Sequence, residues 1–220
     1  MKESAILVRK SFSYAPVKRA LDVSLAALLI VLSAPLILCI ALVIKLSSPG
    51  PVFLRQKRIG KNGQPFSMLK FRTMHSAISE APHIEHARRM ILEDVSPSDL
   101  RARSLKIQED PRITKVGKFL RRNGLDELPQ FINVLRGEMS IVGPRPCMPY
   151  EWDMYSDWHK RRLSILPGIT GLWQVTAHNM VPFSQMVCID LDYIETMSLW
   201  LDLKIILKTP IEMIWGKGNG

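Results

Sequence analysis

Cysteine is scarce in this chain of 220 residues, and its three cysteines lie far apart. Cys39, Cys147 and Cys188 form no Cys-x-x-Cys pair, so the spacing argues against a disulfide framework. A zinc site built on thiolates would also have too few ligands. The simplest interpretation is three small apolar side chains in a reducing compartment.

The common glycine-rich phosphate-binding loops are absent as well. The sequence contains neither G-x-G-x-x-G nor a Walker loop, and it shows no internal repeat and no Ser/His/Asp triad that spacing alone would support. An apolar content of 47% with 23% charged residues excludes a disordered chain and a collagen-like repeat. The chain therefore folds, but it lacks the common nucleotide-binding signatures.

Negative charge is nearly missing from the N-terminal third. Residues 1–72 contain twelve Lys and Arg but only two acids, Glu3 and Asp22, whereas residues 73–220 contain eighteen of each sign. The same third contains the only long apolar run, so the basic excess favours an anionic membrane surface as partner. Nucleic acid is not expected, because residues 73–220 show no basic patch with interleaved aromatic residues.

The apolar run covers residues 23–44 and contains no charge. A helix of this length would measure about 33 Å, just enough to cross a hydrocarbon core of about 30 Å. Pro35 lies past the middle of the run and predicts a kink. Basic residues flank both ends, so the positive-inside rule gives no direction. We expect a re-entrant helical hairpin that enters one leaflet and returns; a single kinked spanning helix is the alternative.

The predicted organisation has three parts: an N-terminal tail over 1–17, the re-entrant membrane helix over 18–48, and a soluble domain with interfacial amphipathic helices over 49–220. The expected fold class is mainly α with a small β-hairpin (α+β). The hairpin is predicted from two β-favouring runs, Val52–Arg58 and Phe66–Arg72, joined by a loop that contains Asn-Gly.

Three helices are predicted in the second half of the soluble domain. Apolar spacing over 113–120 indicates a helix that Asn123-Gly124 ends. A second helix is expected over about 126–135, where Pro129 is tolerated in the first turn. The last is expected over roughly 183–215, and its apolar stripe suits either the core or a membrane interface.

Asp126 and Glu127 are the most informative pair of acids. Both fall in the first turn of a predicted helix, where N–H groups and a partial positive charge keep a carboxylate ionised. An ionised Asp can attack phosphorus, and two adjacent carboxylates can hold Mg²⁺ against a diphosphate. Acids are also common in a first turn simply because they cap the helix, so the pair alone does not establish a site.

Four cations accompany these acids in the sequence. Lys70 and Arg72 end the predicted hairpin, Arg121 ends the helix before the acids, and Arg145 lies between two prolines. An Arg fork binds phosphate oxygens in pairs, and a Lys supplies a point charge. Cations with paired carboxylates suit phosphoryl transfer if the fold brings them together.

Several short motifs follow one another in a characteristic order over residues 16–215. They are Lys18-Arg19-Ala20-Leu21-Asp22, Ser48-Pro49-Gly50-Pro51-Val52-Phe53, Gln56-x-Arg58-x-Gly60, Lys70-Phe71-Arg72-Thr73-Met74, Asp110-Pro111-Arg112-Ile113-Thr114, Leu125-Asp126-Glu127-Leu128-Pro129-Gln130, Gly143-Pro144-Arg145-Pro146 and Pro167-Gly168-Ile169-Thr170-Gly171. Their order resembles the monotopic phosphoglycosyl transferases, the bacterial sugar transferase family that begins the synthesis of exopolysaccharide, capsule, O-antigen and glycoprotein glycans.

The resemblance implies a reaction. Such enzymes move a sugar-1-phosphate from a UDP-sugar to polyprenyl (undecaprenyl) phosphate and release UMP. By the resemblance Asp126 would form a phosphoryl-aspartate intermediate, Glu127 would assist, and Mg²⁺ would bind at the pair. Residues 49–220 would then be a catalytic domain on the cytoplasmic face of the bacterial inner membrane, next to the anionic lipid of its inner leaflet.

The remaining assignments are coarser. Arg121 and Arg145 match family positions near the phosphates, and Lys70 and Arg72 match a motif close to the active site. Ala177-His178-Asn179 stands where the family usually has Gly-Arg-Asn, which leaves the donor sugar open. Homo-oligomerisation is open as well.

On composition alone a different class of protein fits. A non-enzymatic membrane adaptor would bind anionic lipid through the basic N-terminal third and a protein partner through the soluble part. Release of UMP from UDP-sugars distinguishes the two.

Overall fold

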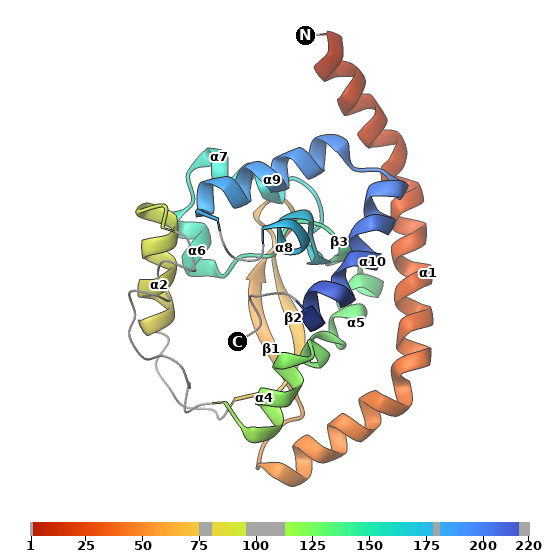
Figure 1. The fold of residues 1–220 in the computed structure, drawn as a ribbon, viewed down its shortest axis with the longest axis vertical. Helices are drawn as coiled ribbons and strands as arrows, with labels where there is room; N and C mark the ends of the chain where they lie inside the picture. Colours follow the sequence, from red (N-terminus) through yellow and green to blue (C-terminus); the bar gives the residue numbers. More distant parts are fainter. Residues whose placement is uncertain (1, 75–80, 96–112, 178–180, 216–220) are drawn as a thin grey trace.

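The computed structural model describes residues 2–74, 81–95, 113–177 and 181–215. One very long helix, α1 (Lys2–Ser47), runs along one side of a body made of short helices and two small sheets (Figure 1). Because α1 is unbroken, the predicted tail over 1–17 and the predicted membrane segment over 18–48 share one helix. The mainly α, α+β class is confirmed.

Helix α1 changes direction in its second, orange half (Figure 1). Pro35 lies inside the helix and removes one of its backbone hydrogen bonds. The Ser33 hydroxyl donates to the Leu29 carbonyl oxygen at 2.5 Å, a competing bond that also favours bending. A hydroxyl thus supports the bend from position 33, although Ala34 directly before the proline has none.

The predicted hairpin is confirmed within one or two residues at each end. Strand β1 (Phe53–Ile59) pairs antiparallel with β2 (Pro65–Phe71). The 3-10 turn η1 (Lys61–Gly63) joins them, with Asn62 at a φ of 55°. Asparagine tolerates this left-handed backbone better than most residues, which explains the strong turn signal.

A second, parallel ladder was not expected from the sequence. Strand β3 (Ser140–Val142) pairs with β4 (Gly168–Thr170). Strands of three residues are too short to show an apolar period, so only the turn-rich character of the flanking loops was visible. The backbones approach so closely that a Cβ at Gly168 would lie 2.1 Å from the Gly143 nitrogen.

Two predicted helices are interrupted. The expected helix over 126–135 is a 3-10 turn, η2 (Leu125–Glu127), followed by Pro129 and α5 (Gln130–Arg136). The expected helix over 183–215 is two helices that break before Ser198, whose Oγ accepts from the Leu201 N–H as a cap. The other helices are α2 (Ala81–Leu92), α4 (Lys115–Arg122), α6 (Pro149–Met154), α7 (Asp157–Lys160), η3 (Arg161–Leu163), α8 (Leu172–Thr176), α9 (Phe183–Thr196) and α10 (Leu199–Trp215).

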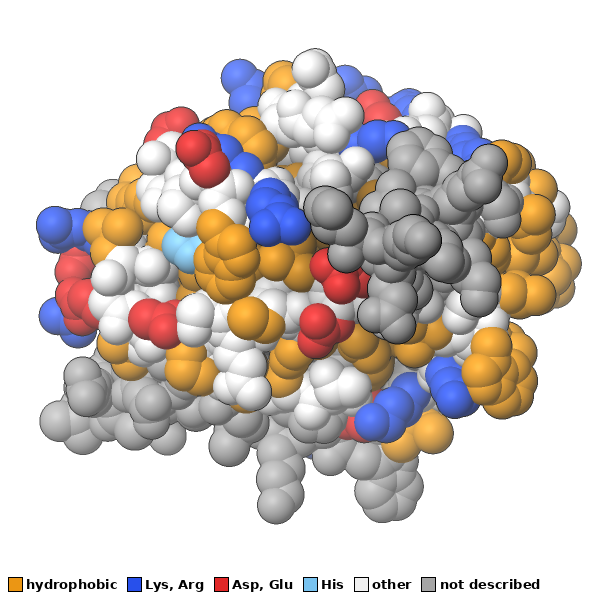
Figure 2. All heavy atoms as spheres, turned by 90° about the horizontal axis from the view of Figure 1, so that it is seen from above, with side chains coloured by type: hydrophobic (Ala, Val, Ile, Leu, Met, Phe, Trp, Pro, Cys, Tyr) orange, Lys and Arg blue, Asp and Glu red, His pale blue; other side chains and the backbone are white. Residues whose placement is uncertain are grey.

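Within the described residues, one helical segment is long and apolar enough to cross a membrane, Tyr14–Ser47. Only 11% of its most apolar window is buried, so it is not the core helix of a soluble protein. Figure 2 shows apolar side chains gathered at the edge of the molecule where α1 lies. The large exposed apolar residues of α1 are Val17, Leu21, Leu28, Val31, Leu32, Leu36, Leu38, Leu42, Val43 and Leu46.

The N-terminal half of α1 is attached to the body by buried polar contacts. Asp202 on α10 accepts hydrogen bonds from Lys18 Nζ at 2.6 Å, Tyr14 at 3.0 Å and Tyr193 at 2.6 Å. One turn further along α1, Asp22 accepts from the Ile141 N–H at 3.0 Å. These charges are buried but paired, which is the condition for keeping them in the folded protein.

The C-terminal end of α1 is attached to the same body. Ile40 and Ile44 pack against Phe71 and Leu120 in one buried apolar cluster. The Arg72 guanidinium donates to the carbonyl oxygens of Pro49 and Ser48 at 3.0 and 2.8 Å and so holds the chain where the helix ends. The helix is therefore fixed at two places, with its exposed apolar middle between them.

Replacing Lys18 by Met is expected to destabilise the protein. The change leaves the buried Asp202 carboxylate without its cation, a loss of about 3 kcal/mol in the free energy of unfolding. Thermal unfolding in detergent measures it, with Lys115→Met as the exposed control. Equal unfolding midpoints for the two variants would show that the pair has no such role.

Candidate active site

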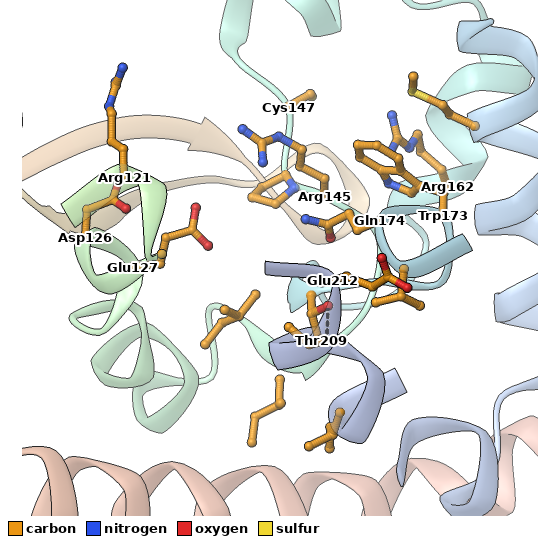
Figure 3. Close-up of a pocket in the computed structure, with 18 of the residues that line it drawn as sticks. Arg121, Asp126, Glu127, Arg145, Cys147, Arg162, Trp173, Gln174, Thr209 and Glu212 are labelled. Carbon is orange, nitrogen blue, oxygen red and sulfur yellow. Dashed lines mark hydrogen bonds between the residues drawn. The ribbon is translucent and has the colours of Figure 1, made fainter. Parts of the chain in front are cut away.

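A large cavity with a volume of about 650 Å³ lies among α1, α5, α8, α10 and the loop after β3. Figure 3 shows part of its lining. Arg121, Asp126 and Glu127 lie at one end, and Trp173 and Gln174 lie at the other. The cavity therefore brings together residues that are about fifty positions apart in the sequence.

The two acids are held by a tight turn. Gly124, which follows the end of α4, has a φ of 61°, in the left-handed range that glycine adopts without strain. The chain then forms η2, in which the Glu127 N–H donates to the Gly124 carbonyl at 3.2 Å. Pro129 follows at the start of α5, where its missing N–H costs nothing. This turn places both carboxylates just before the N-terminus of α5.

Lys70 connects the hairpin to both acids. Its Nζ donates to Glu127 Oε1 at 2.9 Å and lies 3.8 Å from Asp126 Oδ2. The lysine lies near the end of β2. A neighbouring hydrogen bond fixes that strand to α5, because Asn133 Oδ1 accepts from the Leu69 N–H at 2.9 Å. The predicted meeting of this cation with the acid pair is thus present in the structure.

The two carboxyls are in different electrostatic environments. Asp126 is 6% exposed, and this burial raises the pKa of its carboxyl, while Lys70 opposes the shift. Burial also disfavours ionisation of Glu127, but the charges of Lys70 and Arg145 outweigh it and lower the pKa of that carboxyl. The sequence predicted that the N-terminus of a helix keeps the Asp126 carboxylate ionised. In the structure Asp126 instead lies in a short 3-10 turn, and the loss of solvent around it raises the pKa of its carboxyl.

Arg145 projects into the cavity from the loop after β3, between the acid pair and the far end (Figure 3). The loop is fixed on both sides: the Gly168 N–H donates to the Pro144 carbonyl at 2.9 Å, and Arg58 donates to the Pro146 carbonyl at 3.1 Å. The arginine itself is exposed. It is a positioned cation whose guanidinium remains accessible to a ligand.

Arg121 lines the same end of the cavity, but its guanidinium extends away from the acids in Figure 3. Its Nε donates to Thr73 Oγ1 at 3.1 Å. Arg72 does not line the cavity; its guanidinium is occupied by carbonyls near the end of α1, described above. Of the four cations singled out from the sequence, Arg121 and Arg145 line the cavity, and Lys70 contacts the two acids that line it. Arg72 lies outside the cavity lining, and its predicted substrate-binding role stays a prediction.

Sequence reasoning missed the residues at the far end of the cavity. Trp173 and Gln174 on α8, Arg162 on η3 and Thr209 on α10 all line it. The only available signal was the position of Trp173 and Gln174 directly after the glycine-rich turn at 167–171. Isolated polar residues without a characteristic spacing carry no such signal.

The chemistry of Asp126 and Glu127 suits Mg²⁺ as a divalent cation. The described residues contain no group of three or more His, Cys, Asp or Glu side chains that could hold a metal ion. Mg²⁺ commonly takes one or two protein carboxylates and completes its shell with water and substrate phosphates. Asp126 and Glu127, on adjacent residues and facing one cavity, match that pattern better than they match zinc.

Comparison with known proteins gives consistent matches. A model of the family described as "Bacterial sugar transferase" matches residues 13–216. The exopolysaccharide production protein ExoY of Rhizobium meliloti is 43% identical over 208 residues, 92% of this chain and 87% of that protein. The UDP-glucose:undecaprenyl-phosphate glucose-1-phosphate transferase of Caulobacter vibrioides is 44% identical, covering 87% of this chain and 67% of that protein. The protein of the same name from Escherichia coli is 42% identical over 87% of this chain but 39% of its own length.

Replacing Asp126 by Asn is expected to stabilise the protein at pH 7. Because the folded-state pKa of this carboxyl is raised, its ionisation favours the unfolded chain and costs stability above that pKa. The variant should unfold at a higher temperature than the wild type at pH 7, and the difference should shrink as the pH falls and the carboxyl becomes protonated. Asp153→Asn, at an exposed position, is the control and should show no rise. A lower midpoint for Asp126→Asn at pH 7 would contradict the assignment.

Proposed function

This chain belongs to the bacterial sugar transferase family and is a phosphoglycosyl transferase, and on that premise we propose that it transfers a sugar-1-phosphate from a UDP-sugar to polyprenyl phosphate. The transfer would be the first membrane step of a surface polysaccharide or glycoconjugate pathway. The observation that carries the proposal is the contact of Lys70 with Asp126 and Glu127, two acids that line the charged end of a large cavity. The membrane adaptor considered above is set aside, because the family is one of enzymes.

In the first step a carboxylate oxygen of Asp126 attacks the β-phosphorus of the UDP-sugar. A bond forms between that oxygen and the phosphorus, the bond to the bridging oxygen breaks, and UMP leaves with the electron pair. Lys70 and Arg145 supply positive charge where charge develops on the phosphate oxygens. Burial weakens the solvation of the Asp126 carboxylate and favours its neutral form, and the charge of Lys70 opposes this by favouring the ionised form that attacks.

In the second step a phosphate oxygen of the polyprenyl phosphate attacks the same phosphorus. The bond to Asp126 breaks, the carboxylate is regenerated, and the product is a polyprenyl diphosphate sugar. The cavity suits an acceptor that arrives from the membrane, since Leu25 and Leu29 of α1 form part of its wall. Phe131 and Ile206 continue this apolar wall on α5 and α10.

Mg²⁺ is proposed as the cofactor, held by Asp126 and Glu127. When bound, it would neutralise the diphosphate of the donor and make UMP a better leaving group. Glu127 suits the ligand role because Lys70 and Arg145 favour its ionised form against the cost of burial. Lys70 would in addition keep the two carboxylates together before the substrate binds.

We further propose that α1 is re-entrant rather than spanning. The body contacts α1 on both sides of its apolar run: Lys18 binds Asp202, and the segment after Ser47 is held by Arg72. An apolar run whose two flanks contact the same soluble domain would have both flanks on one side of the bilayer, with only the bend inserted. This side would be the cytoplasmic face of the inner membrane, where basic flanks are favoured.

Asp126→Asn is expected to lower the rate of UMP release by at least about a thousandfold, because the amide cannot form the acyl phosphate. The measurement is UMP release from a UDP-sugar by full-length protein in detergent, with polyprenyl phosphate and Mg²⁺. A panel of UDP-sugars identifies the donor. A labelled sugar-phosphate should remain on the wild-type protein, but not on the variant, when acceptor is left out.

Two controls accompany this measurement. Asp153→Asn should release UMP at the wild-type rate, because Asp153 is exposed and does not line the cavity. Chelation with EDTA should stop the wild type, and added Mg²⁺ should restore it. Full activity of Asp126→Asn would refute the nucleophile, and full activity in EDTA would refute the metal.

Cysteine labelling tests the re-entrant helix. Ala15→Cys and Lys45→Cys place single reactive thiols at exposed positions on the two sides of the bend, in a background with Cys39→Ala and Cys188→Ala. Cys147 is 2% exposed and should not react. A maleimide that cannot cross membranes should modify both thiols from the same side of sealed vesicles, the side that also labels Asp153→Cys. Modification from opposite sides would show that α1 spans the bilayer.

A further inference from the structure

Two polar atoms at the far end of the cavity are buried and have no hydrogen-bond partner among the described residues. They are Nε1 of Trp173 and Oε1 of Gln174. Trp173 is 7% exposed, and both residues line the cavity. Burying such groups without a partner costs free energy, so a ligand that supplies the matching acceptor and donor is favoured there. The indole N–H requires an acceptor, and the amide oxygen requires a donor.

The charge of this end differs from that of the acid end. Arg162 is the buried cation here, and its Nε and Nη2 both bind Asp190 Oδ2, at 2.8 and 2.5 Å. The positive charge is therefore balanced within the protein. Lys208 and Glu212 likewise lie 3.8 Å apart. The acid end with Arg145 suits a diphosphate, whereas this end suits an uncharged part of the same substrate.

The walls of this end are largely aromatic. Tyr155, Trp173 and Phe183 line it, and the rings of Tyr155 and Phe183 lie 5.3 Å apart. Flat apolar walls with a few convergent polar atoms are typical of sites for planar heterocycles. Nucleobases are commonly recognised in this way, by contact with aromatic rings on their faces and by hydrogen bonds along one edge.

The geometry points to a uracil subsite formed by Trp173 and Gln174, in which the indole N–H donates to O4 of the base and the Gln174 amide oxygen accepts from N3–H. This inference rests on the proposed function, because it places the base of the UDP-sugar at one end of the cavity and its diphosphate at the other. Figure 3 shows Arg145 between Gln174 and Glu127, where it would meet the diphosphate on its way to Asp126.

The sugar of the donor is the other uncharged group and fits this end less well. A hexose presents several hydroxyls, each of which needs polar partners when it is buried. Here the unpartnered atoms are one donor and one acceptor on neighbouring residues, in a cavity that aromatic residues also line. Uracil presents this complementary pair on one edge and leaves both of its faces apolar.

Binding of UMP and CMP to full-length protein in detergent, measured by calorimetry, tests the subsite. Cytosine carries an N–H₂ group at position 4 and no hydrogen at N3, so it opposes both polar atoms. The wild type should bind UMP at least about tenfold more tightly than CMP. Gln174→Met, which keeps the side-chain length, and Trp173→Phe, which keeps an aromatic ring, should each weaken UMP binding about tenfold and bring the two affinities close together.

Gln185→Met is the matched control, because Gln185 is exposed on α9 and does not line the cavity. It should keep the wild-type preference for UMP. The ratio of turnover between two UDP-sugars should be unchanged in Gln174→Met. Unfolding midpoints show whether each variant is folded, and the two variants test the two hydrogen bonds separately.

The outcomes separate the subsite from the reaction. If folded Gln174→Met and Trp173→Phe keep the wild-type preference for UMP while the wild type releases UMP from UDP-sugars, the subsite is wrong and the proposed function stands. If these variants instead change the preference between UDP-sugars, this end holds the sugar and the inference is also overturned. If the wild type binds neither nucleotide, the subsite is wrong, and the UMP-release assay decides the proposed function separately.

Discussion

The carboxylate of Asp202 joins the three long helices of the molecule. It accepts hydrogen bonds from Lys18 and Tyr14 on α1 and from Tyr193 on α9, while its own residue belongs to α10. Its burial makes each of these bonds costly to lose. The cavity depends on this junction, since α1 and α10 each form part of its wall. A single acid near the basic flank of the membrane helix thus helps to define the space in which the chemistry is proposed.

The cavity changes in character from one end to the other. Lys70 and Arg145 offset the charges of Asp126 and Glu127 at one end, and the far end contains a balanced ion pair and aromatic rings. The apolar wall provided by α1 and α10 forms a third region. A nucleotide sugar and a lipid phosphate contain these same kinds of group: charged phosphates, a flat base and a hydrocarbon tail. Such a division would allow the two proposed substrates to meet at one phosphorus.

Local features of the fold were predictable, and long-range ones were only partly so. The β1–β2 hairpin followed from alternation around Asn62-Gly63, because the signal and its cause are both local. The contact of Lys70 with Asp126 was expected because several cations accompany the acid pair in the sequence and because the motifs resemble those of the family. Arg72 follows the last residue of β2, and its guanidinium binds carbonyl oxygens at the end of α1, a long-range contact that the sequence pattern did not indicate. The β3–β4 ladder and the orphaned atoms of Trp173 and Gln174 arise from tertiary packing, which leaves no period in the sequence.

The attachment of α1 at two separate places has a mechanical consequence. A rod held at one point can roll about its axis and tilt, whereas a rod held near both ends presents one fixed side to its surroundings. In the proposed re-entrant arrangement, the exposed leucines and valines of α1 would face the lipid in a constant orientation, and the soluble body would stay at a constant height. The carboxylate of Asp126, the proposed nucleophile, would then be held at one depth relative to the bilayer surface, so local thinning or thickening of the lipid would shift acceptor phosphate and nucleophile relative to each other.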